Sequence, residues 1–453
     1  MFLCASVVSR FSVANKTGAC CRGKTYLPLF IYSTAPAYLL CLRSTRIVKL
    51  FRGRGMQPEK ILKAEWKRQA HGAITHVYMT PDGSYIGAAS EDHDVYLMEF
   101  GGKLLWANTT GDDVAFVKVS DDGEYVVSYS KDSIISFFNK RGDQLWTYRV
   151  GRRLNALDMD PEGSLVVAGY EDCSVRALDR SGNVTWSRTF RKPVTSVCVS
   201  GSGSLFLVGT AEGRTYMFTS DGRLRWEFIT NSPVVYVFTS YDGEFSYVLE
   251  MMNNTLHCLS DRGNELASST YAGEINDLSI TDDGRYLAIG FSNSQVYFTD
   301  KNLNLLWKSI VPGPVVRLKV SDDSSMVFAT TATHGVYVLN KKGDQLLTFQ
   351  FEDVALGLWC SSDGNYFAAG AKDTIYLFGI SRYLQYIARE QVKVLKLMEA
   401  DKQRALRGKE GQHIEPRPGL AGGLSNSCAR CGTPILSSRT FCNYCEMLNR
   451  RGK

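Results

Sequence analysis

A turn signature that recurs at a nearly constant interval constrains this chain more than any other feature of its sequence. It occurs eight times, and the third residues of successive occurrences are 40, 40, 40, 40, 41, 40 and 40 residues apart. A repeat of this length indicates a solenoid, a propeller or a related array. The eight turns are Pro81-Asp82-Gly83, Asp121-Asp122-Gly123, Pro161-Glu162-Gly163, Gly201-Ser202-Gly203, Tyr241-Asp242-Gly243, Asp282-Asp283-Gly284, Asp322-Asp323-Ser324 and Ser362-Asp363-Gly364.

Tryptophan forms a second ladder with the same period. Six of the eight units carry it, and two carry a smaller residue at the same position. Because tryptophan buries a large apolar area, we expect it to pack as a wedge between neighbouring units. The ladder consists of Trp66, Trp106, Trp146, Trp186, Trp226, Ala267, Trp307 and Leu347.

Each unit has the alternating pattern of several short strands. The turns contain Gly and Asp, which supply the positive φ angles and local hydrogen bonds of tight hairpins, so we expect the repeated aspartates to be turn residues. Four-stranded units of about 40 residues are typical of propeller blades. In the unit around Gly163 the predicted strands are Leu154–Met159, Leu165–Ala168, Val175–Leu178 and Val184–Thr189.

The two ends of the repeat region are incomplete in complementary ways. The last unit supplies three strands, near Val354–Cys360, Tyr366–Ala369 and Ile375–Phe378, and has no fourth. An unmatched strand, Ile61–Arg68, precedes the first unit. Pairing these segments removes the free sheet edges that invite aggregation. The sequence therefore predicts an all-β protein, an eight-bladed β-propeller over residues 56–379 that its N-terminal strand closes.

The units resemble the blades of two related families. Gly142-Asp143-Gln144-Leu145-Trp146 and Gly182-Asn183-Val184-Thr185-Trp186 are similar to the repeat of quinoprotein alcohol dehydrogenases, and turns such as Ser120-Asp121-Asp122-Gly123 resemble those of WD40 propellers. The Trp-Asp and Gly-His dipeptides of true WD40 repeats are missing, which favours the quinoprotein-like branch. The resemblance covers roughly residues 60–379. It implies a fold and leaves the function open, because propellers host many unrelated activities.

The same resemblance allows catalysis to be considered. A quinone-dependent dehydrogenase similar to this family needs a calcium site, a carboxylate base and stacking groups on loops that extend beyond the blades. The even intervals leave no room for such loops, and the vicinal Cys20-Cys21 pair lies outside the propeller. The six histidines show neither metal-ligand spacing nor a nucleophile–base pairing. We therefore expect the protein not to be an enzyme.

Charge divides the chain into three parts. Residues 1–55 carry nine Lys and Arg and no acidic residue, residues 56–379 carry 29 basic and 40 acidic residues, and residues 380–453 carry 14 basic and 6 acidic residues. An acidic propeller argues against nucleic-acid binding by the core, whereas the basic tail allows it. Single cysteines scattered through apolar runs are typical of a reducing compartment, so we expect cytoplasmic localisation.

Residues 1–55 form an extension with three interpretations. The apolar stretch Tyr26–Leu42 has 17 residues, which is at the short limit of a membrane anchor. The segment is also basic and free of acidic residues, as transit peptides are. The third interpretation, which we favour, is a mis-assigned start, with Met56 as the true first residue just before the first strand that the fold needs. A membrane partner is expected only if this extension is a real anchor.

The tail begins with a change to helical periodicity. Residues 380–410 predict a basic amphipathic helix, with an apolar stripe that includes Leu384 and Leu395. The stripe docks on the propeller or pairs with a second helix, so a dimer through residues 381–407 is one of the alternatives. Residues 411–427 contain prolines and glycines and predict a linker.

Two CxxC pairs carry the strongest chemical signal in the chain. They lie ten residues apart in the last segment, residues 428–453, which we interpret as a zinc ribbon. Four thiolates give the closed tetrahedral shell of a structural Zn²⁺, with no open position for catalysis. Such ribbons bind protein or nucleic acid, and a module this small should be unfolded without metal. The predicted ligands of one zinc ion are Cys428, Cys431, Cys442 and Cys445.

Two of the connections between blades carry adjacent cations. Arg152 and Arg153 lie in one, and Arg191 and Lys192 lie in the next, about one repeat later. Equivalent loops of successive blades lie on one face, so these four cations form a candidate site for an acidic peptide or a phosphate. The alternative is a solvated rim, in which nearby acids such as Asp158 and Asp160 pair with them.

These observations favour an interaction scaffold that docks a partner protein, with the zinc ribbon as a second contact. The alternative is a nucleic-acid-associated protein that uses its basic tail and ribbon. A quinoprotein-like dehydrogenase is the third and least favoured hypothesis.

Overall fold

The computed structural model describes residues 62–381 except Val150, and beyond them residues 383–386, 389, 393, 396, 426–427 and 434–435. The predicted extension, residues 1–55, and the four predicted zinc ligands lie outside the described residues. Among the described residues there is no helical segment with the length and apolar content that a bilayer span needs.

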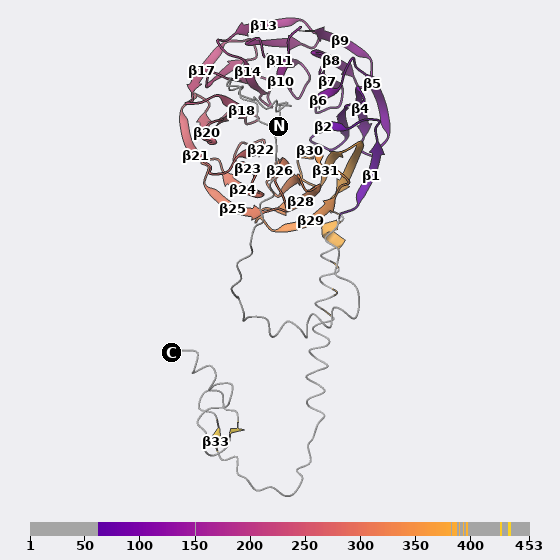
Figure 1. The fold of residues 1–453 in the computed structure, drawn as a ribbon, viewed down its shortest axis with the longest axis vertical. Coiled ribbons are helices and arrows are strands. Elements are labelled where there is room, and N and C mark those ends of the chain that lie inside the picture. The colour runs from indigo at the N-terminus through magenta and orange to yellow at the C-terminus, as the bar shows by residue number, and fades with distance from the viewer. Residues whose placement is uncertain are drawn as a thin grey trace, which may run out of the picture. The chain divides into compact units, whose positions relative to one another are not determined.

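Eight four-stranded antiparallel sheets form a closed ring (Figure 1). In the first seven blades the strands follow one another in sequence, from the innermost near the axis to the outermost at the rim. Blades 1 to 4 consist of β2 (Ile74–Met79), β3 (Tyr85–Ser90), β4 (Asp94–Glu99) and β5 (Leu104–Thr109); β6 (Val114–Val119), β7 (Tyr125–Ser130), β8 (Ile134–Asn139) and β9 (Gln144–Arg149); β10 (Leu154–Met159), β11 (Leu165–Tyr170), β12 (Ser174–Asp179) and β13 (Val184–Thr189); and β14 (Val194–Val199), β15 (Leu205–Thr210), β16 (Arg214–Thr219) and β17 (Leu224–Ile229).

The remaining blades repeat this pattern, except that the eighth is shared between the two ends of the ring. Blades 5 to 8 consist of β18 (Val234–Thr239), β19 (Phe245–Glu250), β20 (Thr255–Ser260) and β21 (Glu265–Thr270); β22 (Ile275–Ile280), β23 (Tyr286–Phe291), β24 (Gln295–Asp300) and β25 (Leu305–Ile310); β26 (Val315–Val320), β27 (Met326–Thr331), β28 (Gly335–Asn340) and β29 (Gln345–Gln350); and β30 (Ala355–Cys360), β31 (Tyr366–Ala371), β32 (Thr374–Gly379) and β1 (Ala64–Gln69).

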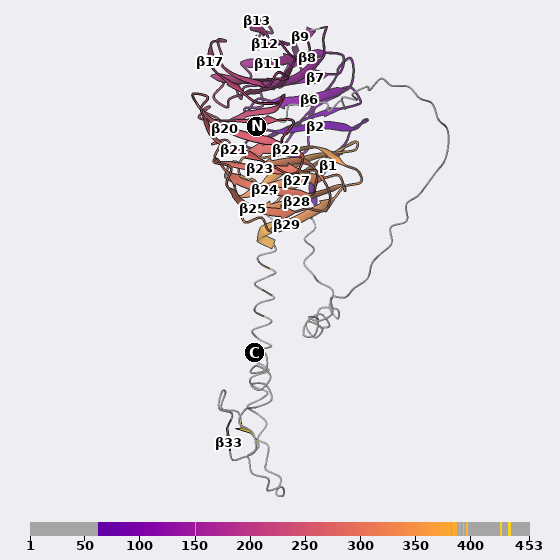
Figure 2. The same ribbon diagram turned by 60° about the vertical axis from the view of Figure 1, so that its left-hand side comes forward.

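The prediction of an eight-bladed ring that its N-terminal strand closes is confirmed. The eighth sheet has the order β1-β32-β31-β30, and Trp66 lies opposite Leu377 in its register. Strand β1 begins at Ala64, later than the predicted Ile61. The reason is that Leu62 is buried and its backbone N–H donates to the Thr348 carbonyl of blade 7, not to a strand of blade 8. The N-terminal end of the repeat region is therefore tied to blades 7 and 8. Figure 2 shows β1 in the same part of the ring as β27 and β28.

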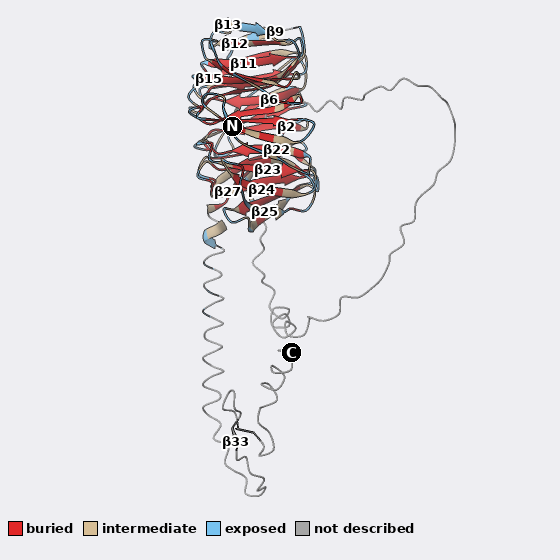
Figure 3. Ribbon diagram, turned by 90° about the vertical axis from the view of Figure 1, so that its left-hand side faces the viewer, coloured by how far each residue is buried: buried red, intermediate tan, exposed pale blue. Residues whose placement is uncertain are grey.

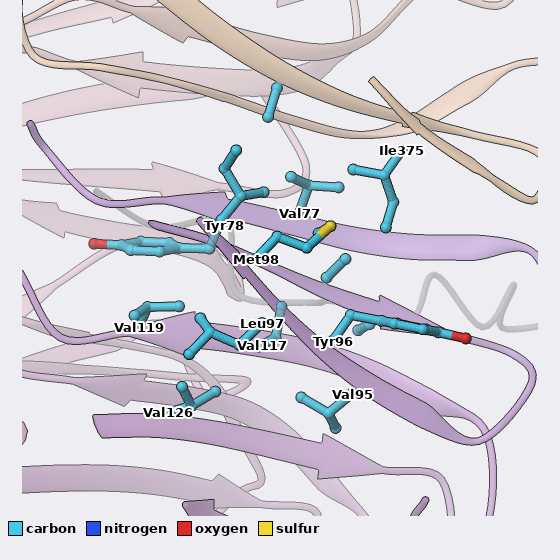
Figure 4. Close-up of a cluster of buried hydrophobic side chains, with 14 of the residues drawn as sticks. Val77, Tyr78, Val95, Tyr96, Leu97, Met98, Val117, Val119, Val126 and Ile375 are labelled. Carbon is cyan, nitrogen blue, oxygen red and sulfur yellow. The ribbon is translucent and has the colours of Figure 1, made fainter. Parts of the chain in front are cut away.

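The core lies between the blades, where the sheets stack face to face. The inner three strands of each blade are mostly buried, and the outermost strands, such as β13, are mostly exposed (Figure 3). In the close-up of Figure 4, Leu97 of blade 1 faces Val117 of blade 2, whereas Val77 lies on the other side of blade 1, beside Ile375 of blade 8. Because each blade buries both of its faces against neighbours, the ring depends on every interface.

The repeated aspartates are turn residues, as predicted. Asp122 accepts hydrogen bonds from the Ser120 hydroxyl (2.6 Å) and the Glu124 N–H (2.9 Å), while the Tyr125 N–H donates to Ser120 Oγ (2.9 Å). The same three bonds recur at the turns of Asp82, Asp283, Asp323 and others. Gly123, at φ 73°, completes this turn.

The tryptophan ladder packs between blades, as predicted, and the structure shows what it packs on. Trp106 of blade 1 donates from Nε1 to the Lys140 carbonyl of blade 2 (3.0 Å). Gly142 lies four residues before Trp146 of the next blade. A Cβ on Gly142 would lie 2.7 Å from the Trp106 ring. The glycine of each Gly-x-x-x-Trp motif therefore makes room for the tryptophan of the preceding blade.

The ring has two faces with different loops. The linker face, as we call it, carries the connections between blades and the turn between the second and third strands of each blade. The turn face carries the Asp-Gly turns and the turns before each outermost strand. This division follows from the antiparallel order of the strands, since successive turns lie at opposite ends of a sheet.

The segment after β32 starts as a helix. The Leu384 N–H donates to the Ile380 carbonyl (2.9 Å), and Tyr383 and Leu384 pack against the buried cluster of blades 7 and 8. Helical residues are described at positions 381, 383–386, 389, 393 and 396, and the rest of the predicted 380–410 helix lies outside the described residues.

Candidate functional site

A belt of backbone hydrogen bonds fixes the loops of the linker face. Glu171 N–H donates to the Arg153 carbonyl (3.0 Å), and Phe190 N–H donates to the Cys173 carbonyl (2.8 Å). Among the described residues, equivalent bonds join the turns of the other blades to the linkers beside them, for example Thr110 N–H to the His93 carbonyl (2.7 Å). Cys173 and His93 have positive φ angles of 70° and 72°, which turn their carbonyls toward the next linker. The linker face is therefore a rigid surface, although it consists of loops.

The four cations predicted as a binding site lie on this belt. Arg152, Arg191 and Lys192 are exposed, and Arg153 is half-buried beside Tyr129. They occupy equivalent linkers of blades 3 and 4, whose inner strands β10 and β14 are neighbours. The structure thus places the two pairs on one face, as the repeat predicts.

Asp158 and Asp160 do not neutralise these cations, and the alternative of a solvated rim stays open, with Glu171 and Asp172 exposed in the turn between the two linkers. Strand β10 carries both acids away from the linker toward the turn face, where Asp158 pairs with Lys118 and Asp160 accepts hydrogen bonds from Ser164 and Leu165. Within the described residues, no ion pair and no cation–ring contact is recorded for any of the four cations.

Cations on the turn face have a different role. The Lys140 ammonium lies 4.6 Å from the Tyr85 ring centroid and 2.9 Å from Glu124 Oε1. Arg180 lies 4.5 Å from the Tyr125 ring centroid in the same geometry one blade later. These side chains tie each blade to the one before it. Among the described residues, no such contact is found for Arg152, Arg153, Arg191 or Lys192.

The axis of the ring holds buried charges at the ends of the inner strands. Lys118 Nζ lies 3.1 Å from Asp158 Oδ1, and Asp158 Oδ2 accepts the Val199 N–H of the next blade (2.8 Å). Burial raises the pKa of Asp158 to about 6, although Lys118 opposes the shift. Burial lowers the pKa of Lys319 to about 8. These groups join neighbouring inner strands across the blade interfaces.

Two small cavities open at the axis on the turn face. One measures about 70 Å³ and is lined in part by Tyr78, Lys118 and Asp121, and the other measures about 50 Å³ and includes Lys319 and Asp322. A water molecule occupies about 30 Å³, so each cavity holds one or two waters. Pockets for organic ligands are usually about 300 Å³ or larger. Both cavities lie beside buried polar groups of the inner strands.

The structure also groups residues that the sequence leaves apart. His93, Asp112 and Asp113 each offer a ligand atom, and these atoms lie within 4.8 Å of one another. Lys131 Nζ already lies 2.9 Å from Asp113 Oδ2, and the group is largely exposed to solvent. A cation bound there would compete with this ammonium, so the group is better explained as a surface ion-pair cluster.

Near the predicted zinc ribbon only a short hairpin is described. Asn426–Ser427 (β33) pairs antiparallel with Pro434–Ile435 (β34). The six residues between these strands include Cys428 and Cys431. The positions of all four cysteines lie outside the described residues, so the zinc site stays a prediction.

The fold defines the class of the protein: it is an all-β, eight-bladed β-propeller. Residues 59–196 match the sequence model of a family described as outer membrane protein assembly factor BamB. Residues 164–295 match a family of unknown function. Each match covers less than half of the chain, and no curated protein matches it.

Solved structures share the fold at low sequence identity. The protein Sqt1 of Saccharomyces cerevisiae is 13% identical, with a TM-score of 0.61, over 70% of this chain and 99% of Sqt1. The computationally designed protein Ika8 is 17% identical, also with a TM-score of 0.61, over 71% of this chain and 99% of Ika8. Identities this low show the propeller fold and nothing about function.

Proposed function

We propose that this protein is a non-catalytic interaction scaffold, and that it docks an acidic segment of a partner protein on the linker face. The observation that carries the proposal is the group of four cations, Arg152, Arg153, Arg191 and Lys192, which have no recorded ion pair and lie on a hydrogen-bonded belt. Because the backbone of these linkers is already held by hydrogen bonds, binding has to order the four side chains but not the loops that carry them. Arginine also offers bidentate geometry for carboxylates.

Two features support a role without catalysis. The turns between second and third strands have only two to four residues, for example residues 372–373, 91–93 and 251–254, so no long loop is available there to build a reaction site. The axial cavities of about 70 and 50 Å³ are too small for a quinone cofactor.

Cytoplasmic localisation stays part of the proposal, and the buried free thiols of Cys198, Cys258 and Cys360 support it.

An affinity pull-down from native lysate tests the scaffold. Replacing Arg152, Arg153, Arg191 and Lys192 with glutamate should remove protein partners that the unchanged chain retains after nuclease treatment. The matched control replaces four exposed cations of the turn face with glutamate and should keep those partners. The control residues are Lys103, Arg141, Arg262 and Lys342.

Two other results would contradict the proposal. Partners that remain on the linker-face variant would show that the four cations are not the docking site. Partners that vanish with nuclease, or with a chain that ends at Gly379, would favour the alternative in which the basic tail and ribbon bind nucleic acid.

We also propose that the tail holds one structural Zn²⁺ through Cys428, Cys431, Cys442 and Cys445. The paired CxxC spacing supports this, together with the hairpin whose strands flank the first pair in sequence. Metal analysis of the purified chain should find about one zinc per chain. The Cys428→Ser/Cys431→Ser variant should lose it while the propeller keeps its melting temperature. A zinc-free native protein would refute the site.

A further inference from the structure

One turn of the linker face departs from the 40-residue period. The interval of 41 residues falls in blade 5, where residues 251–254 connect β19 to β20, whereas three residues, such as 91–93, make the same turn in blade 1. The additional residue lies in the sequence Met251-Met252-Asn253-Asn254. The longest of these turns therefore brings two methionines to the surface.

These methionines are unusually exposed for apolar residues. Met252 is 76% exposed and Met251 is 55% exposed, and Ile229, at the end of the neighbouring strand β17, is 61% exposed. We call these three residues the apolar patch. Methionine is flexible and polarisable, and it is over-represented at binding surfaces that adapt to their ligands.

The turn that carries the patch is held in place. The Met251 N–H donates to the Pro233 carbonyl (2.9 Å), and the Met252 N–H donates to Ser232 Oγ (3.1 Å). Glu250 is buried, and its Oε2 accepts the Asn231 N–H (3.1 Å). The two exposed methionines therefore lie on a turn whose backbone is fixed by hydrogen bonds, which is not the case in a frayed loop.

The belt connects the apolar patch to the four cations. From the linker of Arg191 and Lys192, the Pro193 carbonyl accepts the Ala211 N–H (2.9 Å), and the Gly213 carbonyl accepts the Thr230 N–H (2.8 Å) next to Ile229. Blades 3, 4 and 5 follow one another along one arc of the ring (Figure 1). The cations and the apolar patch are consecutive parts of one surface.

Charge decides what can cover this surface. The two ends of the chain, residues 1–55 and 380–453, carry net charges of +9 and +8 from the residue counts above, so both are repelled by the four cations. A nucleic acid would complement the cations but offers no apolar side chain for three exposed apolar residues. A peptide with acidic residues followed by an apolar anchor complements both parts.

We propose that the linker face of blades 3 to 5 binds a peptide segment of a partner protein in which a cluster of acidic residues is accompanied by an apolar anchor. The acidic cluster contacts Arg152, Arg153, Arg191 and Lys192, and the anchor packs on Ile229, Met251 and Met252. This inference rests on the proposed scaffold function and adds the identity of the motif.

Selection of a displayed library of random 16-residue peptides on the full-length protein tests the motif. The enriched peptides should share an acidic cluster and a large apolar residue at a fixed distance from it. Fluorescence anisotropy with one enriched peptide should then show about tenfold weaker binding to the Ile229→Thr/Met251→Ser/Met252→Ser variant, since three apolar contacts are lost. Leu305→Ser/Leu306→Ser, which changes two half-exposed residues of β25, should bind like the unchanged protein and is the matched control.

The outcomes separate this inference from the scaffold proposal. Acidic peptides that lack an apolar anchor, or that bind the apolar-patch variant unchanged, overturn the inference and leave the cation site standing. Peptides that bind the glutamate variant of the four cations unchanged overturn both. Tighter binding of a 20-residue polyuridine RNA than of any enriched peptide, lost with the same glutamate variant, also overturns both. Circular dichroism and melting curves identify any variant that has failed to fold.

Discussion

A single buried ion pair shows how the inner strands hold the ring together. Asp158 lies in blade 3, receives Lys118 from blade 2 and accepts a backbone N–H from Val199 of blade 4. Both side chains are almost entirely excluded from solvent. Because a buried charge is tolerated only when it is paired, removing one partner costs far more than the pair contributes.

We expect Lys118→Met to destabilise the protein by about 3 to 5 kcal/mol near pH 8. The loss should be smaller at pH 5. Burial already raises the pKa of Asp158 to about 6, and removing the ammonium raises it further. A carboxyl group whose pKa is raised by folding favours the folded state below its unfolded pKa, and this contribution is lost as the pH rises through the folded pKa. Urea unfolding at the two pH values measures the difference.

Lys103→Met is the control for this prediction. Lys103 is exposed and lies 3.8 Å from Glu99, so its removal should change stability little at either pH. An equal loss at pH 5 and pH 8 for Lys118→Met would show that the lost side-chain packing, and not the uncompensated carboxylate, dominates.

The unit of assembly at the element scale is a tryptophan of one blade set against a glycine of the next. The interface between blades 5 and 6 departs from this rule at both positions. Ala267 replaces the tryptophan, and Leu303, at φ 61° and almost fully buried, stands at the glycine position of blade 6. Both residues belong to the same apolar cluster. Leu303 therefore fills the space that a tryptophan side chain occupies at the other interfaces.

This exchange predicts strong coupling between the two positions. Ala267→Trp alone should destabilise by about 1 to 3 kcal/mol, because Leu303 occupies the space. Leu303→Gly alone should destabilise through the cavity it leaves. The double variant rebuilds the arrangement of the other blades and should be more stable than the sum of the single effects by at least about 1 kcal/mol. A double-mutant cycle measured by urea unfolding checks this, and additive effects would contradict it.

Element by element, the regular features were predictable and the exceptions were not. The Asp-Gly turns and the Trp ladder recur with one chemistry, so the sequence predicts both the strands and the blade interfaces. The positive-φ residues of the linker face have no shared chemistry, since His93, Ser133, Cys173 and Asn254 all take the role, and only backbone hydrogen bonding unites them. No pattern of residue types in the sequence predicts this belt of backbone hydrogen bonds.

The candidate surface was predictable in the same partial way. The period alone places Arg152 and Lys192 on one face, and that prediction needed no structure. The exposure of Met252 was missed because a one-residue change in the interval shows neither in which turn the insertion lies nor toward which face it points. The acids assigned to the rim, such as Asp158, were misplaced because a six-residue strand carries the chain across the sheet to the other face.

At the scale of the whole molecule, stability depends on the closing blade. Strand β1 covers the edge of β32, and Trp66 donates from Nε1 to the Phe100 carbonyl of blade 1 (2.7 Å), which joins the last blade to the first. The glycine opposite Trp66, Gly102, follows the same rule as the other interfaces. Closure is therefore built from the same contacts as every other interface.

Removing β1 should weaken the whole ring and not only blade 8. We expect a chain that begins at Ala70 to melt roughly 10 °C lower than one that begins at Leu62, since several kcal/mol of packing and pairing are lost and each kcal/mol is worth a few degrees in a domain of this size. Differential scanning calorimetry of the two chains measures this. An unchanged melting temperature would show that β1 is dispensable for closure.

Closure by the first strand also determines when the ring can close during biosynthesis. Gln69 hydrogen-bonds to Asp373, a residue 304 positions later in the chain. At translation rates of about 5 to 20 residues per second, β1 leaves the ribosome roughly 15 to 60 s before its partner strand has been made. During that time the nascent chain is an open fan of blades with an unpaired strand at its leading end. The time a cell must shield this protein from aggregation is therefore determined by where its ring closes.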